Sequence, residues 1–241
     1  RLGALEDATG IAAGLAMRLR AGLREIDYGQ WGGKTPEDVG RELRDDYLPR
    51  LADGGPDYVR RFLPALHRLY DTVFFFGEPV VAAVNGAAVG IGTTMLMHCD
   101  LVYCADNSVF SMPFVSLGVC PEFASSLLIP LNAGYHKAVE KLLLADPISA
   151  SEALEMKIVN RILPRDDVLD FAIKQAERFN QLPPASVRTT KRLLRSGWKT
   201  VTEKVIADEA NSFGQMVRSA EAKEAFTAFF ERRKPDFSKF S

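Results

Sequence analysis

The sequence predicts an α/β core followed by an α-helical region, and two patterns carry this prediction. As far as Pro164, short apolar segments with strand character alternate with segments of helical periodicity, which is typical of parallel strands covered by helices. Beyond Pro164 the periodicity is helical only. We therefore expect a core over residues 1–180 and a C-terminal helical region over residues 181–241.

The chain length and the net charge limit which classes of protein and of binding partner the sequence suits. The chain has 241 residues and a mass of 26.6 kDa, enough for one large domain. Its 30 Lys and Arg residues against 31 Asp and Glu residues give a net charge of −1. No global field therefore favours nucleic acid or an anionic membrane, and no apolar run reaches the ~18 residues of a membrane span. We expect neither kind of partner.

The three cysteines are Cys99, Cys104 and Cys120. An odd number without a CxxC pair predicts buried thiols in a reducing compartment rather than disulfides or a zinc site. We accordingly expect no metal ion and a cytoplasmic protein, with the peroxisome and the mitochondrion left open.

The chain is organised around residues 79–130. The continuous small-apolar run Val80–Val84 predicts a strand that is buried on both faces. Gly86, Gly90 and Gly92 follow it and lead into a helical segment, Thr93–Met97. Glycines at such a point let the backbone approach a ligand closely, and a helix start offers unpaired N–H groups.

The remaining elements follow from periodicity and from turn residues. Ser149 and Glu152 have the spacing of a capping box, which predicts a helix start. Pro183 and Pro184 separate the last predicted helices from those before them. Further strands are expected at residues 101–104, 109–112 and 159–163, and helices at residues 10–27, 35–51, 57–76, 136–145 and 166–179.

Glu122 is the carboxylate that stands out. It follows Gly118-Val119-Cys120-Pro121 and precedes Phe123-Ala124-Ser125-Ser126, so its neighbours are apolar or small. Desolvation in such surroundings raises the pKa of a carboxyl group and makes it a candidate proton shuttle. The alternative is an acid at a helix N-terminus that interacts with the helix dipole, since Pro121 and the two serines also suit a helix start.

The same stretch resembles the crotonase (enoyl-CoA hydratase/isomerase) superfamily. The resemblance lies in PVVAAVNGAAVGIG, HCDLVYCAD and FSMPFVSLGVCPE, and it continues through residues 148–164 to AFFERRKPDF near the C-terminus. It implies a crotonase-like spiral of ββα units with a C-terminal α-helical trimerisation region, hence a homotrimer or a dimer of trimers. It also implies an acyl-CoA substrate whose thioester oxygen lies in an oxyanion hole of two backbone N–H groups, with no cofactor besides the coenzyme A of the substrate.

The resemblance assigns roles to individual residues. The N–H of Ile91 takes the second oxyanion position, and Ala88, Gly90 and Phe114 belong to segments that contact the substrate. Lys234, next to Arg232 and Arg233, is placed to meet the phosphates of coenzyme A. The equally weighted alternative for this basic cluster is a solvated helix end that complements the helix dipole.

The carboxylates decide which reaction the resemblance implies. Hydratases of the superfamily use two glutamates, and Thr94 and Phe114 stand at those two positions here. Glu122 stands where the peroxisomal-type Δ3,Δ2-enoyl-CoA isomerases carry a single catalytic glutamate. We therefore expect an isomerase that moves a double bond from C3 to C2 of an enoyl-CoA. The alternatives are a non-catalytic acyl-CoA-binding or scaffold protein and an enoyl-CoA hydratase.

Other candidate groups fit less well. His98 is expected to be a hydrogen-bonded core or surface residue rather than half of a dyad with Asp100, because alternate residues entering a strand point to opposite faces. His67 and His136 lack partners at metal-ligand spacing. Ser125 and Ser126 lack the sequence context of a nucleophile elbow.

One expected segment is missing from the sequence. Superfamily members carry A/S-G-x-D-L/F, which supplies the first oxyanion N–H, and residues 1–79 contain no match. Residue 1 is Arg rather than Met. We expect the native protein to carry this strand–glycine segment, either before residue 1 or within the N-terminal half.

Overall fold

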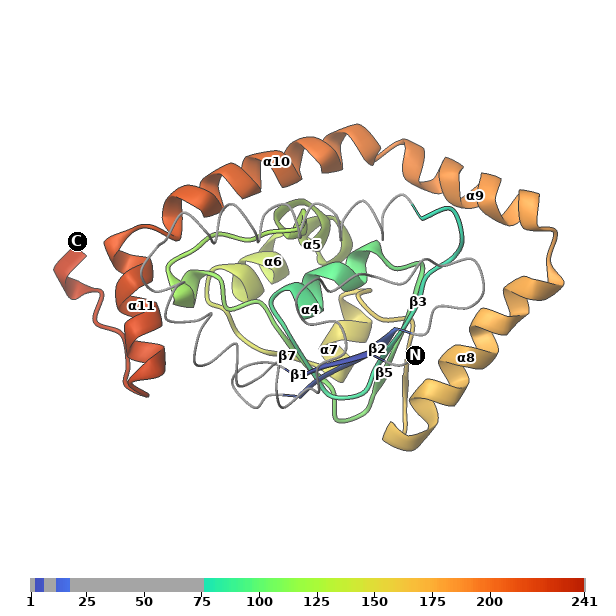
Figure 1. The fold of residues 1–241 in the computed structure, drawn as a ribbon, viewed down its shortest axis with the longest axis horizontal. Helices are drawn as coiled ribbons and strands as arrows, with labels where there is room; N and C mark the ends of the chain where they lie inside the picture. The colour runs from blue at the N-terminus through green and yellow to red at the C-terminus, as the bar shows by residue number, and fades with distance from the viewer. Residues whose placement is uncertain (1–2, 7–11, 18–75, 241) are drawn as a thin grey trace.

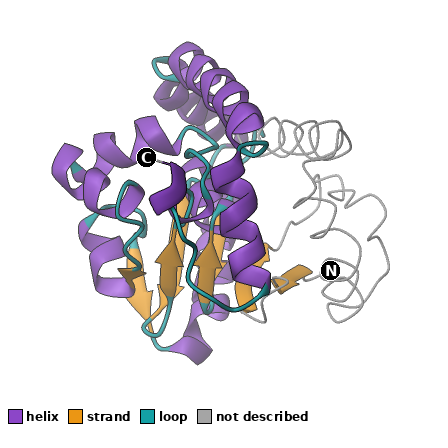
Figure 2. Cartoon of the chain, turned by 90° about the vertical axis from the view of Figure 1, so that its left-hand side faces the viewer, coloured by secondary structure: helices purple, strands orange, loops and turns teal. Residues whose placement is uncertain are grey.

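The structure, a computed structural model, describes residues 3–6, 12–17 and 76–240. The strands of these residues form a five-stranded sheet in the order β1-β2-β3-β5-β8 and a three-stranded sheet in the order β4-β6-β7. Helices lie on both sides of the strands (Figure 2). The first sheet consists of β1 (Gly3–Glu6), β2 (Ala12–Met17), β3 (Val81–Val84), β5 (Leu101–Ala105) and β8 (Arg161–Leu163), and the second of β4 (Ala87–Val89), β6 (Val109–Ser111) and β7 (Ile148–Ser149).

The helices of the described residues fall into two groups. Short helices lie between the strands, and longer ones form an arc from the right of Figure 1 over its top to its left. The short helices are α4 (Ile91–Thr94), α5 (Ser125–Ala133), α6 (Tyr135–Leu142) and α7 (Ala150–Glu155), with the 3₁₀ helices η3 (Met95–His98), η4 (Val115–Leu117) and η5 (Arg165–Asp167). The arc consists of α8 (Val168–Arg178), α9 (Pro184–Ser196), α10 (Lys199–Met216) and α11 (Ala220–Phe230), with η6 (Phe179–Gln181) before α9 and η7 (Ser238–Phe240) after α11.

From β3 to β6 consecutive strands alternate between the two sheets, as expected for a spiral of ββα units. The strands β3 and β5 pair in parallel within the larger sheet, whereas β4 and β6 pair in parallel within the smaller one. The pairs β3–β4 and β5–β6 therefore each send their first strand to the larger sheet and their second strand to the smaller one. The helix α4 leads from β4 back to the larger sheet at β5, whereas after β6 the chain adds β7 to the smaller sheet before it returns at β8.

The strand β3 is buried on both faces, as the sequence predicted. Ala82 and Val84 belong to the main hydrophobic cluster, whereas Ala83 belongs to a second cluster that includes Val168 of α8. This alternation follows from the two-residue period of a strand. The main cluster also takes in residues from the C-terminal arc, among them Ile206 of α10 and Ala222 of α11.

Several sequence predictions are confirmed within the described residues. Strands lie at β5, β6 and β8, and helices at α6 and α8, close to the expected bounds. The capping box is present: the Ser149 hydroxyl accepts from the Glu152 N–H at 3.3 Å, and the Ser149 N–H donates to the Glu152 carboxylate at 3.0 Å.

Two predictions about local structure were wrong or incomplete. Residues 12–17 form β2 rather than part of a helix over residues 10–27, because β2 pairs antiparallel with β3, with Leu15 opposite Val84. The hydrogen bonds of that ladder override the helical spacing of the leucines. The glycine-rich run also contains the strand β4, which the sequence did not indicate. The helix expected at residues 35–51, and the helix expected at residues 57–76 apart from its last residue, lie outside the described residues.

Asp100 fixes α9 against the sheet. It lies just before β5, and its carboxylate accepts the Val80 N–H at 2.7 Å, the Lys191 ammonium at 2.7 Å and the Arg195 guanidinium at 3.1 Å. Lys191 is only 8% exposed and also donates to the Glu78 carbonyl at 2.7 Å. One carboxylate thus joins the start of β3, the start of β5 and two turns of α9.

A glycine lets α11 approach the loop that leads to Glu122. Gly118 has φ +68°, a left-handed conformation, and a Cβ placed there would lie 2.7 Å from the Cα of Ala222 and 2.7 Å from its N. Real Cβ atoms do not come this close to backbone atoms. The packing of α11 on this loop therefore requires a glycine at position 118.

We expect Gly118→Ala to lower the free energy of unfolding by about 3 kcal/mol, because it combines a left-handed backbone with a clash that backbone atoms cannot relieve. Gly197→Ala is the matched control: Gly197 has φ −66°, and no atom lies within 4 Å of its added Cβ. Urea unfolding measures both variants. An unchanged midpoint for Gly118→Ala would contradict the packing described for α11.

Candidate functional site

Glu122 lies in the loop between η4 and α5 and is almost wholly buried, at 5% exposure. Its Oε1 accepts a hydrogen bond from the Thr94 hydroxyl at 2.6 Å. Its Oε2 is buried, and no described residue gives it a hydrogen-bond partner. Glu122 therefore presents one carboxyl oxygen that Thr94 holds and one to which the described residues give no partner.

The surroundings of Glu122 raise its pKa to about 8. Burial is the largest cause, the Thr94 hydroxyl opposes it by favouring the carboxylate, and the nearby Glu209 carboxylate raises the pKa further. With such a pKa, both the carboxylate and the protonated carboxyl form are populated near neutral pH. A group that accepts and then returns a proton requires this. The desolvation predicted from the neighbours of Glu122 is thus present in the structure.

Ile91 begins α4 directly after β4. Gly90 has φ 57° and serves as the N-cap of α4, and its N–H donates to the Ser111 carbonyl at 2.9 Å. As the first residue of the helix, Ile91 has an N–H without a partner inside the helix. Its oxyanion role stays a prediction, because no substrate is present to accept from it.

The helix α4 connects Ile91 to Glu122. Thr94 lies three residues after Ile91 in the four-residue helix, and its hydroxyl holds the Glu122 carboxylate. The neighbouring Thr93 donates its hydroxyl to the Ala88 carbonyl at 2.6 Å, which ties α4 back onto β4. The carboxylate and the candidate oxyanion donor are therefore positioned by one short helix.

The other predicted substrate-binding residues lie in different surroundings. Ala88 is buried within β4, and Phe114 is buried immediately before η4. Lys234 is exposed beyond the end of α11. The adjacent Arg233 pairs with Glu224 at 2.6 Å, so this member of the basic cluster closes the C-terminal segment onto α11. Substrate contacts of all these residues remain predictions.

The helix-dipole alternative for Glu122 does not match the structure. The helix α5 begins at Ser125 with Ala124 as its N-cap, so Glu122 lies outside its first turn. The carboxylate that meets this helix start is Glu209 of α10, which accepts from the N–H groups of Ala124 and Ser126. No local sequence pattern pointed to Glu209, because it lies 85 residues after Ala124, on a different helix.

The remaining candidates have structural roles. His98 is buried, its Nε2 hydrogen-bonds the Phe123 carbonyl at 2.7 Å, and burial lowers its pKa to about 4. Of the two expected placements, core or surface, the structure has the hydrogen-bonded core histidine. The three cysteines are unpaired thiols whose pKa values burial raises to about 12 for Cys99 and about 11 for Cys104 and Cys120. The described residues contain no cluster suited to a metal ion and no helix long and apolar enough to cross a membrane.

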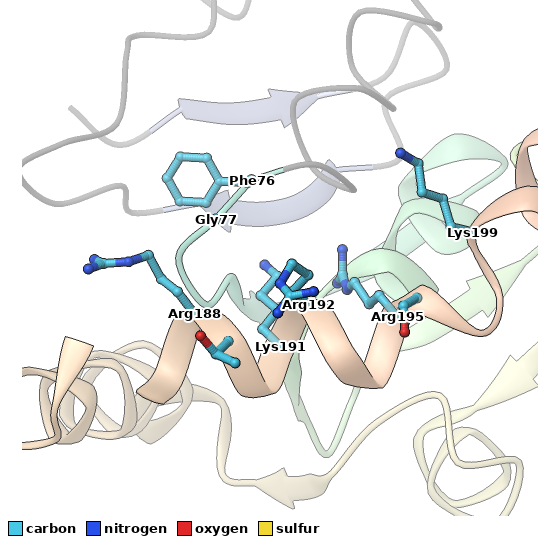
Figure 3. A pocket seen from close by; sticks show the side chains of 9 residues that line it. Phe76, Gly77, Arg188, Lys191, Arg192, Arg195 and Lys199 are labelled. Carbon is cyan, nitrogen blue, oxygen red and sulfur yellow. The ribbon is translucent and has the colours of Figure 1, made fainter. Parts of the chain in front are cut away.

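A basic pocket lies elsewhere, along α9 and the segment before β3 (Figure 3). It has a volume of about 430 Å³, and Glu122 is not among its lining residues. Arg188 is paired with Glu78 at 2.8 Å, and Lys191 and Arg195 are paired with Asp100, so these cations hold α9 in place. The lining residues are Phe76, Gly77, Arg188, Thr189, Lys191, Arg192, Arg195, Ser196 and Lys199.

Comparison with known proteins adds to this geometry. The sequence profile of the enoyl-CoA hydratase/isomerase family matches residues 51–239. The chain belongs to this family. The resemblance seen in the sequence is thereby confirmed, and so is the crotonase fold.

Individual relatives carry both hydratase and isomerase names. A crotonyl-CoA hydratase of Syntrophomonas wolfei is 35% identical over 179 residues, which cover 74% of this chain and 69% of the relative. Enoyl-CoA delta isomerase 2 of Rattus norvegicus is 33% identical over 168 residues, covering 70% and 43%. A probable enoyl-CoA hydratase of Bacillus subtilis is 33% identical, and the chain covers 66% of its length.

A solved structure gives the same result for the fold. The crystal structure of an enoyl-CoA hydratase/isomerase from Pseudoalteromonas atlantica matches with a TM-score of 0.70 and 38% identity, covering 72% of this chain and 70% of the other. Across these comparisons the chain spans about two thirds of the length of most relatives.

The N-terminal part has a second similarity. The profile of the histidine phosphatase superfamily (branch 1) matches residues 4–68. Most of these residues lie outside the described part, as does the stretch in which the first oxyanion segment was sought. That stretch is thus similar to a different family, and the expected segment stays a prediction.

The hydrogen bond from Thr94 can be tested by titrating Glu122. We expect Glu122 to titrate near 8 and, in Thr94→Val, at a higher pH, because the variant removes a donor that favours the carboxylate. Carbon-13 NMR of glutamate-labelled protein, with Glu122→Gln for assignment, follows the titration. Thr190→Val is the control, since it makes the same chemical change at an exposed residue of α9. A titration at ordinary carboxyl pH would contradict the burial of Glu122.

Proposed function

We propose that the protein is an enoyl-CoA isomerase that moves a double bond from C3 to C2 of an enoyl-CoA thioester, with Glu122 as its only acid/base group. One observation carries the proposal: the buried Glu122 carboxyl has one oxygen held by Thr94, one without a partner among the described residues, and a pKa of about 8. A group with these properties can take a proton and keep it until it is returned.

The reaction needs a single base. Glu122 removes a proton from C2 of a 3-enoyl-CoA, and the electron pair of that C–H bond delocalises into the thioester oxygen and the C3–C4 double bond. The Ile91 N–H donates to the oxygen as charge develops there. The protonated Glu122 then returns its proton to C4, which leaves the double bond between C2 and C3.

The oxyanion interaction needs two donors to be fully effective. Each preorganised N–H donor contributes about 3 kcal/mol of barrier lowering in a site that excludes water. Ile91 supplies one of them in this proposal, and a segment outside the described residues supplies the other. Because the step transfers only a proton, we propose no metal and no cofactor besides the coenzyme A that the substrate carries.

The two hydratase positions favour isomerisation over hydration. Addition of water requires one carboxylate to activate the water and an acid to protonate the substrate. Thr94 is engaged in holding Glu122, and Phe114 is a buried hydrocarbon. Glu209 does not replace them, because three donors of the loop around α5 occupy its carboxylate. The hydratase names among the relatives describe those proteins.

We expect Glu122→Gln to lower the kcat for isomerisation of a 3-enoyl-CoA by about 10⁴-fold, because the amide keeps the size of the side chain but cannot accept the proton. KM should change little. In the wild type, kcat/KM should rise about tenfold per pH unit up to about 8, since the carboxylate is the active form. The exposed Glu155→Gln is the control.

The same preparation distinguishes the alternatives. Hydration of a 2-enoyl-CoA at a rate comparable to isomerisation would favour a hydratase. Binding of acyl-CoA without turnover in the wild type would favour a scaffold protein. Near wild-type isomerisation by Glu122→Gln would show that the assigned base is wrong.

We propose that the chain assembles into a homotrimer or a dimer of trimers through its C-terminal arc, in a reducing compartment such as the cytoplasm. The supporting observation is a group of exposed apolar side chains on α9, on α10 and in the turn between them, where charged residues would be expected on a free surface. These side chains are Leu193, Leu194, Trp198 and Val201.

We expect sedimentation at micromolar concentration to give a trimer or hexamer. Leu194→Glu should shift the protein toward monomers, because Leu194 is 73% exposed in the single chain and a buried unpaired charge opposes association. A monomeric wild type would contradict the proposal.

A further inference from the structure

The turn that follows Glu122 has an unfavourable backbone conformation. Phe123 has φ 60° and Ala124 has φ 61°, and both are non-glycine residues in the left-handed region. Such residues cost of order 1–3 kcal/mol each and persist where the surroundings over-determine them. Two of them in succession, directly after the proposed base, call for an interaction that holds the turn.

Glu209 of α10 supplies that interaction. Its Oε2 accepts the Ala124 N–H at 2.6 Å, and its Oε1 accepts the Ser126 N–H at 3.0 Å and the Ser126 hydroxyl at 2.5 Å. These donors lie on both sides of the α5 start. Glu209 is 7% exposed, so water competes little for its oxygens.

Two further contacts complete the turn but do not replace Glu209. The His98 ring hydrogen-bonds the Phe123 carbonyl, and the Ser125 hydroxyl donates to the Glu122 carbonyl at 2.7 Å. Both bind carbonyl groups. Glu209 alone among these contacts binds the N–H groups of the turn, so its removal leaves the Ala124 N–H buried without an acceptor.

The carboxylate form of Glu209 suits this role, since it accepts all three hydrogen bonds. Burial raises the pKa of Glu209 above its ordinary value, and the donors of Ala124 and Ser126 oppose this rise by favouring the carboxylate. Its charge acts on Glu122 in turn. The titratable groups that face Glu122 from the described residues are Glu209 of α10 and Cys120 of its own loop, a thiol that stays neutral near pH 8.

We propose that Glu209 is a positioning residue for the proton shuttle: its carboxylate holds the left-handed turn that aims the Glu122 side chain at Thr94 and the substrate. This inference rests on the proposed role of Glu122 as the base. It assigns to the C-terminal arc a function in the chemistry of the site, in addition to any role in assembly.

A purely structural role for Glu209 predicts different effects when the residue is replaced. A helix cap needs an acceptor only for the first N–H groups of α5, and its loss lowers stability by about 1 kcal/mol without changing the folded site. A positioning role predicts that the turn and Glu122 move while the rest of the protein stays folded. A displacement of about 1 Å in a catalytic group costs roughly 10²-fold in rate.

The experiment compares Glu209→Gln and Glu209→Ala with Asp208→Asn. Asp208 is the neighbouring acid on α10, 61% exposed and paired with Lys204, so its variant removes the same charge from the same helix without touching the turn. The glutamine can accept from Ser126, but its amide group opposes the Ala124 N–H. It therefore retains most of the packing and guards against simple unfolding.

We expect kcat to fall about 10²-fold in Glu209→Ala and less in Glu209→Gln, because the side chain of the base is displaced from its productive position. KM should stay within about threefold of wild type, because the substrate-binding site is retained. In Glu209→Gln the acid limb of the kcat/KM profile should move to lower pH, since a negative charge that raises the pKa of Glu122 is gone. Asp208→Asn should resemble wild type in each measurement.

Hydrogen exchange and NMR provide readouts that do not depend on turnover. Exchange should accelerate in peptides covering residues 122–130 in both Glu209 variants and stay unchanged in α8. The titration of labelled Glu122 should shift to lower pH in Glu209→Gln but not in Asp208→Asn.

If exchange of the turn and the Glu122 titration match wild type in both Glu209 variants, the inference is wrong, whatever reaction the protein catalyses. A fall in melting temperature with unchanged kcat and an unchanged Glu122 titration would reduce Glu209 to a helix cap and also overturn it. Absence of isomerisation in the wild type, with the exchange and titration effects present, would count against the proposed function alone.

Discussion

The parallel pairing of β3 with β5 is the constraint from which the site and its support follow. Val81 lies opposite Leu101 and Val84 opposite Cys104, so the two strands start and end together. At their common start, the Asp100 carboxylate anchors α9 to the sheet. Beyond their common end, the chain enters the second sheet and turns into α4. The same register therefore determines where the C-terminal arc is anchored and where α4, which carries the proposed oxyanion donor, begins.

The site depends on keeping a carboxyl group out of water without giving it a cation. An ionised carboxylate in such a place is costly, and the described part of the protein offers Glu122 a hydroxyl rather than an ion pair. A lysine or arginine in the place of Thr94 would stabilise the carboxylate and lower its basicity. The hydroxyl fixes the direction of the side chain while leaving its proton affinity high, which suits a group that must both take and return a proton.

The sequence alone identified the elements whose causes are local. A few consecutive residues are enough to predict the local structure in three places: the strand at Val80–Val84, the helix start with the capping box at Ser149, and the desolvated surroundings of Glu122. It missed what distant contacts decide: β2 forms a strand because β3 offers it a partner, and Glu209 meets the turn only because α10 crosses above α5. The proposed proton-shuttle role of Glu122 was inferred from the resemblance together with desolvation, whereas the residues that contact Glu122 could be found only from the three-dimensional arrangement.

The separation of Glu209 from the turn it binds has a consequence for the order of folding. Strands β3 to β6 and helix α4 can assemble from neighbouring segments, but the contact between Ala124 and Glu209 spans 85 residues. Contacts of such sequence separation form late, since closing the intervening loop costs entropy that earlier contacts do not repay. During synthesis, the ribosome must release α10 before the turn acquires its left-handed conformation. A nascent chain can thus have a folded sheet while the turn after Glu122 still lacks the carboxylate that holds it.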